Sequence, residues 1–189
     1  MGGFFGVVSK VNCREDLYYG TDYHSHLGVM RGGLAVRNGK GFTRSIHDIR
    51  TTQFRSKFEG EIDSFVGNAG IGVISDFEDQ PLIVASHLGT FAIVTVGRVI
   101  NLQELAQELF TKSRVQFSEM SQEGVNPTEL VAMLIGMRDS FVEGIAYAQE
   151  KIQGSCSMLV LTDKGTIYAA RDRFGRTPVV LGCKDGAVA

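Results

Sequence analysis

Residues 154–182 read GSCSMLVLTDKGTIYAARDRFGRTPVVLG. Two apolar runs flank Asp163-Lys164-Gly165, a turn sequence whose glycine accepts a positive φ at little cost. The pattern predicts a β-hairpin that begins near Cys156, and a further strand is expected after Pro178. This part of the chain is therefore expected to form antiparallel sheet.

Strand signals recur through the first half of the chain. The run from Asn38 to Gly41 is typical of a tight turn between two strands, because Asn-Gly tolerates positive φ. The strands expected before residue 100, given as residue ranges, are 3–9, 33–37, 42–44, 67–75, 82–87 and 91–96.

Helix signals lie between these strands. Residues 46–58 carry apolar side chains at helical spacing, and 16–27 is expected to form a short helix or turn region. A polar cap with a glutamate three positions later predicts helices that start at Asn101 and at Asn126.

The second of these helices has the clearer start, since Pro127 suits the first helical position. It is expected to continue toward Gln153, with a break near Gly144. Strands followed by two helices and further strands, with hairpins throughout, predict an antiparallel α+β protein.

Length and composition limit the possible classes. The 189 residues are 43% hydrophobic and 21% charged, which is enough for one sizeable core, so one domain over residues 1–189 is expected. A net charge of -2 and a pI near 6.1 give no reason to expect a nucleic-acid partner. Because no leader-like start or long apolar run occurs, we expect a cytoplasmic protein with no membrane partner.

The cysteines and histidines do not form a metal-binding pattern. Cys13, Cys156 and Cys183 are widely spaced and form no Cys-x-x-Cys pair, so reduced thiols are expected, the last two in buried or half-buried positions. His24 and His26 form a pair without a clear third ligand, and no metal or other cofactor is expected.

The stretch quoted above resembles the end of a class II glutamine amidotransferase domain, and is most similar to the glutaminase domains of amidophosphoribosyltransferases. That family has strand, turn and strand, and then Arg-Asp-x-x-Gly-x-x-Pro-Leu-x-x-Gly. The matching residues here are Arg171, Asp172, Gly175, Pro178 and Gly182. The resemblance implies the N-terminal-nucleophile fold, a four-layer αββα sandwich with two antiparallel sheets between helical layers. It also implies that the Arg171-Asp172 pair is architectural.

The start of the chain departs from this family at the nucleophile. Members begin Met-Cys-Gly-Ile-Phe-Gly, and the cysteine becomes N-terminal once methionine is removed. This chain begins Met-Gly-Gly-Phe-Phe-Gly, so Gly2 occupies the cysteine position. An α-amine can act as base for its own thiol, but Gly2 has only the amine. Cys13 is no substitute, because a strand of about 20 Å separates it from that amine.

The oxyanion and carboxylate positions also differ. The family holds the oxyanion with the asparagine side chain and glycine N–H of a His-Asn-Gly segment, which matches Thr95-Val96-Gly97. The resemblance therefore implies that Val96 lacks the side-chain donor while Gly97 keeps the backbone donor. The arginine that clamps the substrate carboxylate matches Val73, which cannot make a charge-assisted contact.

The remaining substrate positions are mixed. The aspartate that pairs with the glutamine α-amine matches Pro127, or Asn126 if the register slips by one, and neither is an anion. The resemblance implies that His26, Ser75, Asp76 and Gly97 are retained in the pocket, with His26 orienting the first strand. The lid before Gln80-Pro81 is expected to be several residues shorter than usual.

Two functional hypotheses follow from the resemblance. The first is an amidotransferase-like domain of an amidophosphoribosyltransferase-like protein of purine biosynthesis, which has lost glutamine hydrolysis and has a structural, regulatory or ligand-sensing role. The alternative is an active amidotransferase with an atypical site that supplies ammonia to a phosphoribosyltransferase domain. Such a C-terminal partner domain, a homo-oligomer and truncation at Ala189 are expected.

Overall fold

The computed structural model describes residues 2–27, 30–113, 120–121 and 124–189. The first half of the chain forms β1 (Gly3–Ser9), α1 (Arg14–Asp22), β2 (Arg31–Asn38), β3 (Gly41–Asp48), α2 (Phe54–Phe58), η1 (Ile62–Ser64), β4 (Ala69–Ser75), β5 (Leu82–Ser86) and β6 (Gly89–Val99). The second half forms α3 (Leu102–Ser113), β7 (Met120–Ser121), β8 (Gly124–Val125), α4 (Pro127–Ile135), α5 (Phe141–Lys151), β9 (Gly154–Thr162), β10 (Ile167–Ala170), β11 (Cys183–Lys184) and β12 (Ala187–Val188).

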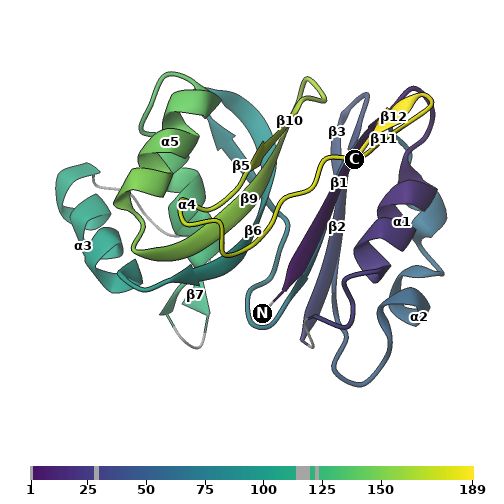
Figure 1. The fold of residues 1–189 in the computed structure, drawn as a ribbon, viewed down its shortest axis with the longest axis horizontal. Helices are drawn as coiled ribbons and strands as arrows, with labels where there is room; N and C mark the ends of the chain where they lie inside the picture. The colour runs from purple at the N-terminus through teal and green to yellow at the C-terminus, as the bar shows by residue number, and fades with distance from the viewer. Residues whose placement is uncertain (1, 28–29, 114–119, 122–123) are drawn as a thin grey trace.

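Two antiparallel sheets face each other between helices (Figure 1). The first sheet has the order β11-β12-β1-β4-β2-β3, and the second has the order β10-β9-β6-β5. Helices α1 and α2 cover the outer face of the first sheet, and α3, α4 and α5 lie on the outer side of the second (Figure 1). The expected four-layer sandwich of two antiparallel sheets between helices is confirmed.

Side-chain alternation along the strands divides the core into three clusters. In β4, Ile71 and Val73 pack between the sheets, whereas Ile74 packs under α1 and α2. In β6, Val94 and Val96 face the same inter-sheet layer, and Ile93 faces the helices of the other side. We name the inter-sheet layer the central core, and it contains Ala35, Ala69, Ile71, Val73, Ala92, Val94, Val96, Leu159 and Leu161.

The hairpin expectations are confirmed. β9 and β10 pair around the Asp163–Gly165 turn, and β2 and β3 pair around Gly39-Lys40. The first strand has the bounds expected from the sequence. The strand expected after Pro178 is wrong, because regular pairing resumes only in the β11–β12 hairpin.

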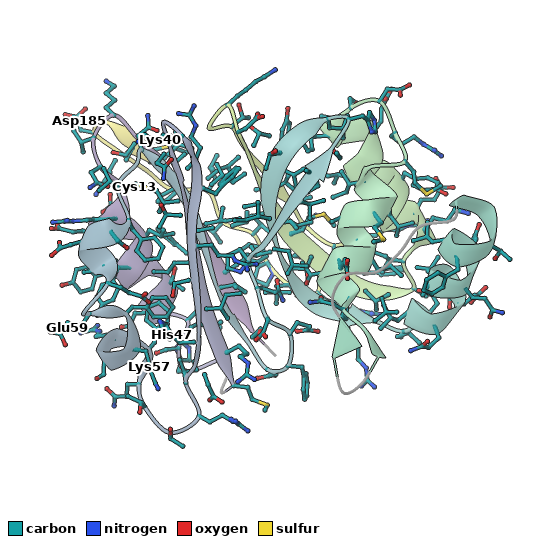
Figure 2. All side chains as sticks on the ribbon, turned by 180° about the vertical axis from the view of Figure 1, so that it is seen from behind. Cys13, Lys40, His47, Lys57, Glu59 and Asp185 are labelled. Carbon is teal, nitrogen blue, oxygen red and sulfur yellow. The ribbon has the colours of Figure 1, made fainter. Side chains whose placement is uncertain are left out.

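The helix expected over 46–58 is wrong except for its last residues. Ile46 is paired with Gly33 in the β2–β3 ladder, and Asp48 ends the strand by accepting a hydrogen bond from the Arg50 backbone N–H at 2.9 Å. His47 (Figure 2) therefore lies on a strand instead of opening a helix. Its ring packs edge-on against the Phe58 ring, with 4.7 Å between the ring centroids. The helical spacing arose because the turn after β3 and helix α2 bury apolar side chains in one cluster.

The break expected near Gly144 is misplaced. The chain leaves the helical path after Ile135 and restarts at Ser140, whose hydroxyl accepts from the Glu143 N–H at 3.2 Å as an N-cap. Gly144 lies inside α5, where a Cβ would come 2.3 Å from the Ile135 carbonyl oxygen. Glycine therefore serves close packing of α4 against α5 at this position.

No helix among the residues described by the structure is long and apolar enough to cross a bilayer.

Candidate functional site

The N-terminal end of β1 lies against the C-terminal end of β4. Gly3 is paired with Ile74 in the β1–β4 ladder, and Gly2 directly precedes this pair. A Cβ at Gly2 would come 2.1 Å from the Ile74 carbonyl oxygen and 3.3 Å from the Ser75 Cα. Since ordinary contacts begin at 3.4 Å, any side chain at position 2 requires the backbone to shift.

Val73 and Val96 come from opposite sheets and share the central core. Val73 is 1% exposed and is paired with Phe4 of β1, while Val96 is 7% exposed. The structure thus brings the expected clamp and oxyanion positions into one layer. Two buried isopropyl groups supply neither a cation for a carboxylate nor a hydrogen-bond donor for an oxyanion.

Gly97 has a structural explanation in this fold. Its φ of 144° lies in the region that favours glycine, and a Cβ would come 2.2 Å from the Ser155 carbonyl oxygen. The residue is paired with Cys156 in the β6–β9 ladder. The close approach of these strands is therefore sufficient reason for glycine at this position, whatever the role of its N–H group.

A buried amide network, which the sequence motifs do not predict, is centred on Gln80. The Gln80 side chain is 1% exposed, accepts from the Thr95 N–H at 2.6 Å and donates to the Thr95 carbonyl at 3.2 Å. It extends the β5–β6 ladder, in which Leu82 is paired with Ile93. The Gln80-Pro81 pair at the end of the expected lid is the only sequence signal for this network.

The same network holds the start of α4. The Thr95 and Thr128 hydroxyl oxygens are 2.6 Å apart and both side chains are buried. Asn126 caps the helix, with its side-chain oxygen accepting from the Thr128 N–H at 2.9 Å, and Pro127 occupies the first turn. The two expected amine-binding positions therefore adjoin β6 at Thr95, on the helix side of the strand, whereas Val96 faces the central core. Helix capping is a sufficient local reason for Asn126.

The loop between β4 and β5 is tied to both sheets. Ser75 is 4% exposed and its hydroxyl donates to the Glu78 carbonyl at 2.6 Å. Arg31 forms an ion pair with Asp79 at 2.8 Å, and Asp76 is half-buried between these anchors. At the end of the loop next to β5, Gln80 is held by its hydrogen bonds to the Thr95 backbone. The segment expected to form a lid is therefore a short connection that is anchored at both ends.

The histidine expected against the first strand is replaced by its neighbour. His26 is exposed on the turn after α1, whereas the His24 ring lies over Gly3, where a Cβ would come 2.6 Å from its Nδ1. Burial and nearby His26 lower the pKa of His24. The resemblance matches the family's Gln-His-Arg-Gly segment with Ser25-His26-Leu27-Gly28, and Gly28 lies outside the residues that the structure describes.

Asp172 organises the segment after β10. It is 2% exposed, and its two carboxylate oxygens accept from the Phe174 and Thr177 N–H groups at 3.0 and 2.9 Å. Its own N–H donates to Ser157 Oγ at 2.9 Å. These contacts support the expected architectural role for this aspartate.

The cysteines do not supply a nucleophile near Gly2. Burial raises the pKa of Cys13 to about 11 and that of Cys156 to about 12, so both are thiols at neutral pH. Cys183 is exposed on β11, contrary to the buried or half-buried position expected. All three are free cysteines. Within the described ranges, no cluster of three or more His, Cys, Asp or Glu side chains is placed to hold a metal.

Comparison with known families settles the relationship of the chain. Residues 69–189 match the family model described as a glutamine amidotransferase domain. The chain belongs to this family. The matched region includes β4 with Val73, β6 with Val96 and Gly97, and the turn organised by Asp172.

Glutamine amidotransferase relatives are longer than this chain. The amidophosphoribosyltransferase of Methanocaldococcus jannaschii is 29% identical over 194 residues, covering 96% of this chain and 40% of that protein. Glutamine--fructose-6-phosphate aminotransferase of Haemophilus influenzae is 24% identical, covering 96% of this chain and 30% of the relative. The glutamine phosphoribosylpyrophosphate amidotransferase of B. subtilis, solved with ADP and GMP, has the same fold, with a TM-score of 0.83, 23% identity and coverage of 100% and 41%.

Proposed function

We propose that this amidotransferase domain has lost glutamine hydrolysis and serves an amidophosphoribosyltransferase-like protein of purine biosynthesis as a structural, regulatory or ligand-sensing module. The observation that carries this proposal is the burial of Val73 and Val96 in the central core. These valines stand where the resemblance places an arginine and an asparagine of the family's site. Burial of an unpaired polar group costs about 1–3 kcal/mol, so such a layer resists a glutamine headgroup.

The position of Gly2 supports the same proposal. The backbone carbonyl of Ile74 occupies the space that a Cβ at position 2 needs. Pro127 has no charge to pair with an α-amine, and its neighbour Asn126 uses its side-chain oxygen to cap α4. The nucleophilic thiol, the side-chain oxyanion donor, the carboxylate clamp and the anionic amine partner are therefore all missing from the matched positions, and only the Gly97 backbone donor remains. A single missing thiol would be weaker support.

A glutaminase assay on the wild-type protein tests this proposal. Mass spectrometry first establishes whether Met1 has been removed, and glutamate formation is then followed against a heat-inactivated sample and an active glutaminase. We expect no turnover above the heat-inactivated sample and no saturable glutamine binding by calorimetry. Clear turnover that survives substitution of Cys13, Cys156 and Cys183 would establish the alternative, an atypical active site.

The assembly is also a proposal. The chain spans about 40% of the Methanocaldococcus jannaschii relative, which leaves room in that protein for a phosphoribosyltransferase domain. We propose such a domain as the partner of this one, within a homo-oligomer. Sedimentation of the natural full-length protein, with and without residues 1–189, tests whether this domain contributes to the interface.

A further inference from the structure

An open cavity of about 570 Å³ lies at the end of the first sheet away from Gly2. Three connections surround it: residues 10–12 after β1, residues 37–40 at the β2–β3 turn, and residues 64–68 before β4. Because β1 separates this cavity from the candidate site, the two are roughly 20 Å apart. Figure 2 shows Lys40 at this end of the sheet, with Lys57 of α2 toward the other end.

The cavity lining is strongly cationic in a chain that is slightly acidic overall. Its charged residues are Lys10, Arg37 and Lys40, with no Asp or Glu among the lining side chains. The whole chain has 21 acidic and 19 basic residues, so this is a local reversal of charge. Three cations that line one hollow create a positive potential there.

These cations form no ion pair within the described part of the chain. The ion pairs formed there involve neither Lys10 nor Lys40. Arg37 donates from Nε to the Asp163 backbone carbonyl at 2.8 Å, a neutral acceptor that leaves the guanidinium charge uncompensated. That bond fixes the Arg37 side chain beside the cavity and leaves its terminal N–H groups for a ligand.

The loops that form the cavity are held in shape by asparagines. The Asn12 side-chain oxygen accepts from the N–H groups of Arg14 at 3.2 Å and Gly67 at 3.4 Å, which joins two of the three connections. The Asn38 side chain accepts from the Lys40 N–H at 2.9 Å and donates to Thr43 at 2.9 Å. A preformed cavity reduces the ordering cost of binding.

We propose that this cavity binds a small molecule through its phosphate group. A phosphate dianion accepts from several cations at once, and lysine ammonium groups bind phosphate as point charges. Val11 and Val66 on the lining are 71% and 57% exposed, and they give an organic phosphate an apolar surface. Because these valines lie beside the cations, the ligand is a phosphate ester in preference to free phosphate.

Calorimetric titration with inorganic phosphate, pyrophosphate and phenyl phosphate tests the proposal, with backbone NMR to locate the site. We expect one saturable site, the tightest binding for phenyl phosphate among the monophosphates, and shifts of the Asn12, Gly39 and Asn68 amides. The Lys10→Ala/Lys40→Ala double variant should weaken phenyl phosphate binding by about tenfold or more, because two charge-assisted contacts are lost. Higher ionic strength should weaken it further.

A charge-matched comparison separates a site from general attraction. Lys40→Ala should weaken binding several-fold, whereas Lys57→Ala on α2 removes the same charge and should leave the dissociation constant unchanged. Equal effects of both variants, shifts confined to other loops, or no saturation at millimolar ligand would overturn the proposal. Tight binding of single-stranded nucleic acid without phenyl phosphate binding would also overturn it.

Discussion

Restoring a cysteine at position 2 should not restore glutamine hydrolysis. In Gly2→Cys the new Cβ lies 2.1 Å from the Ile74 carbonyl oxygen, against 3.4 Å for ordinary contact. The backbone must therefore move by about 1 Å, and overpacking of this kind costs about 1–3 kcal/mol of stability. The substitution supplies a thiol but changes nothing at Val73 or Val96.

The size of the remaining defect follows from the other positions. A missing oxyanion donor lowers the rate by about 10²–10³, and a missing charged contact to substrate weakens binding by about 1.5–3 kcal/mol. A reacting group displaced by 1 Å can cost a further factor of about 10². From a typical kcat of about 10 s⁻¹, the turnover number of Gly2→Cys should stay below about 10⁻² s⁻¹.

The assay measures glutamate by mass spectrometry after Met1 removal has been verified. Gly2→Ala is the matched control, because it adds the same Cβ without a thiol. Both variants should lose about 1–3 kcal/mol of unfolding free energy in urea. Turnover of about 1 s⁻¹ in Gly2→Cys alone would refute the claim that several site functions are missing together. Unchanged stability in both variants would refute the predicted clash with Ile74.

Three further predictions concern packing and thiol chemistry. Gly144→Ala should lower the unfolding free energy by about 1–3 kcal/mol in urea titration, because the new Cβ lies 2.3 Å from the Ile135 carbonyl oxygen. This loss is expected despite the better helix propensity of alanine. The control Gly39→Ala, which has open space around it, should stay within about 0.5 kcal/mol of wild type. In native protein a disulfide reagent should modify Cys183 rapidly and Cys13 and Cys156 only after denaturant is added; equal native rates would contradict the burial argument. Folding raises the pKa of Cys156 from 9.0 to about 12, so the buried thiol contributes its full stability below pH 9. As pH rises from 9 toward 12 the unfolding free energy should fall by about 1.4 kcal/mol per pH unit. Cys156→Ala should therefore flatten the profile of stability against pH in the alkaline range.

The sheets were predictable because their signals are local. Asp163–Gly165 and Asn38–Gly41 encode tight turns, and the apolar runs on either side of each turn pair with each other. The helix expected over 46–58 failed because apolar spacing alone does not separate a strand end, a turn and a short helix. Only Ile49 of the turn and Phe54 and Phe58 of α2 share one cluster. The hydrogen bond from the Arg50 N–H to the Asp48 carboxylate ends the strand. It forms only when the backbone turns after Asp48, and the composition of the segment does not specify that turn.

The candidate site was predictable from motif alignment only at the level of positions. Val73 and Val96 were expected in one pocket, and they do share a layer. The exchange of His26 for His24 could not be foreseen, because a short turn after α1 decides which ring covers Gly3. Gln80 was also missed, since its partner is the Thr95 backbone and any residue type except proline at position 95 would serve.

The valines between the sheets have an evolutionary consequence. Introducing asparagine at Val96 or arginine at Val73 one at a time would bury a polar group without partners, at a cost of about 1–3 kcal/mol or more. Marginally stable proteins tolerate few such steps. Gaining the family's polar site groups therefore requires several simultaneous substitutions, because the single-step variants are less stable. Descendants of this chain are expected to vary on their surface and to leave that interior apolar.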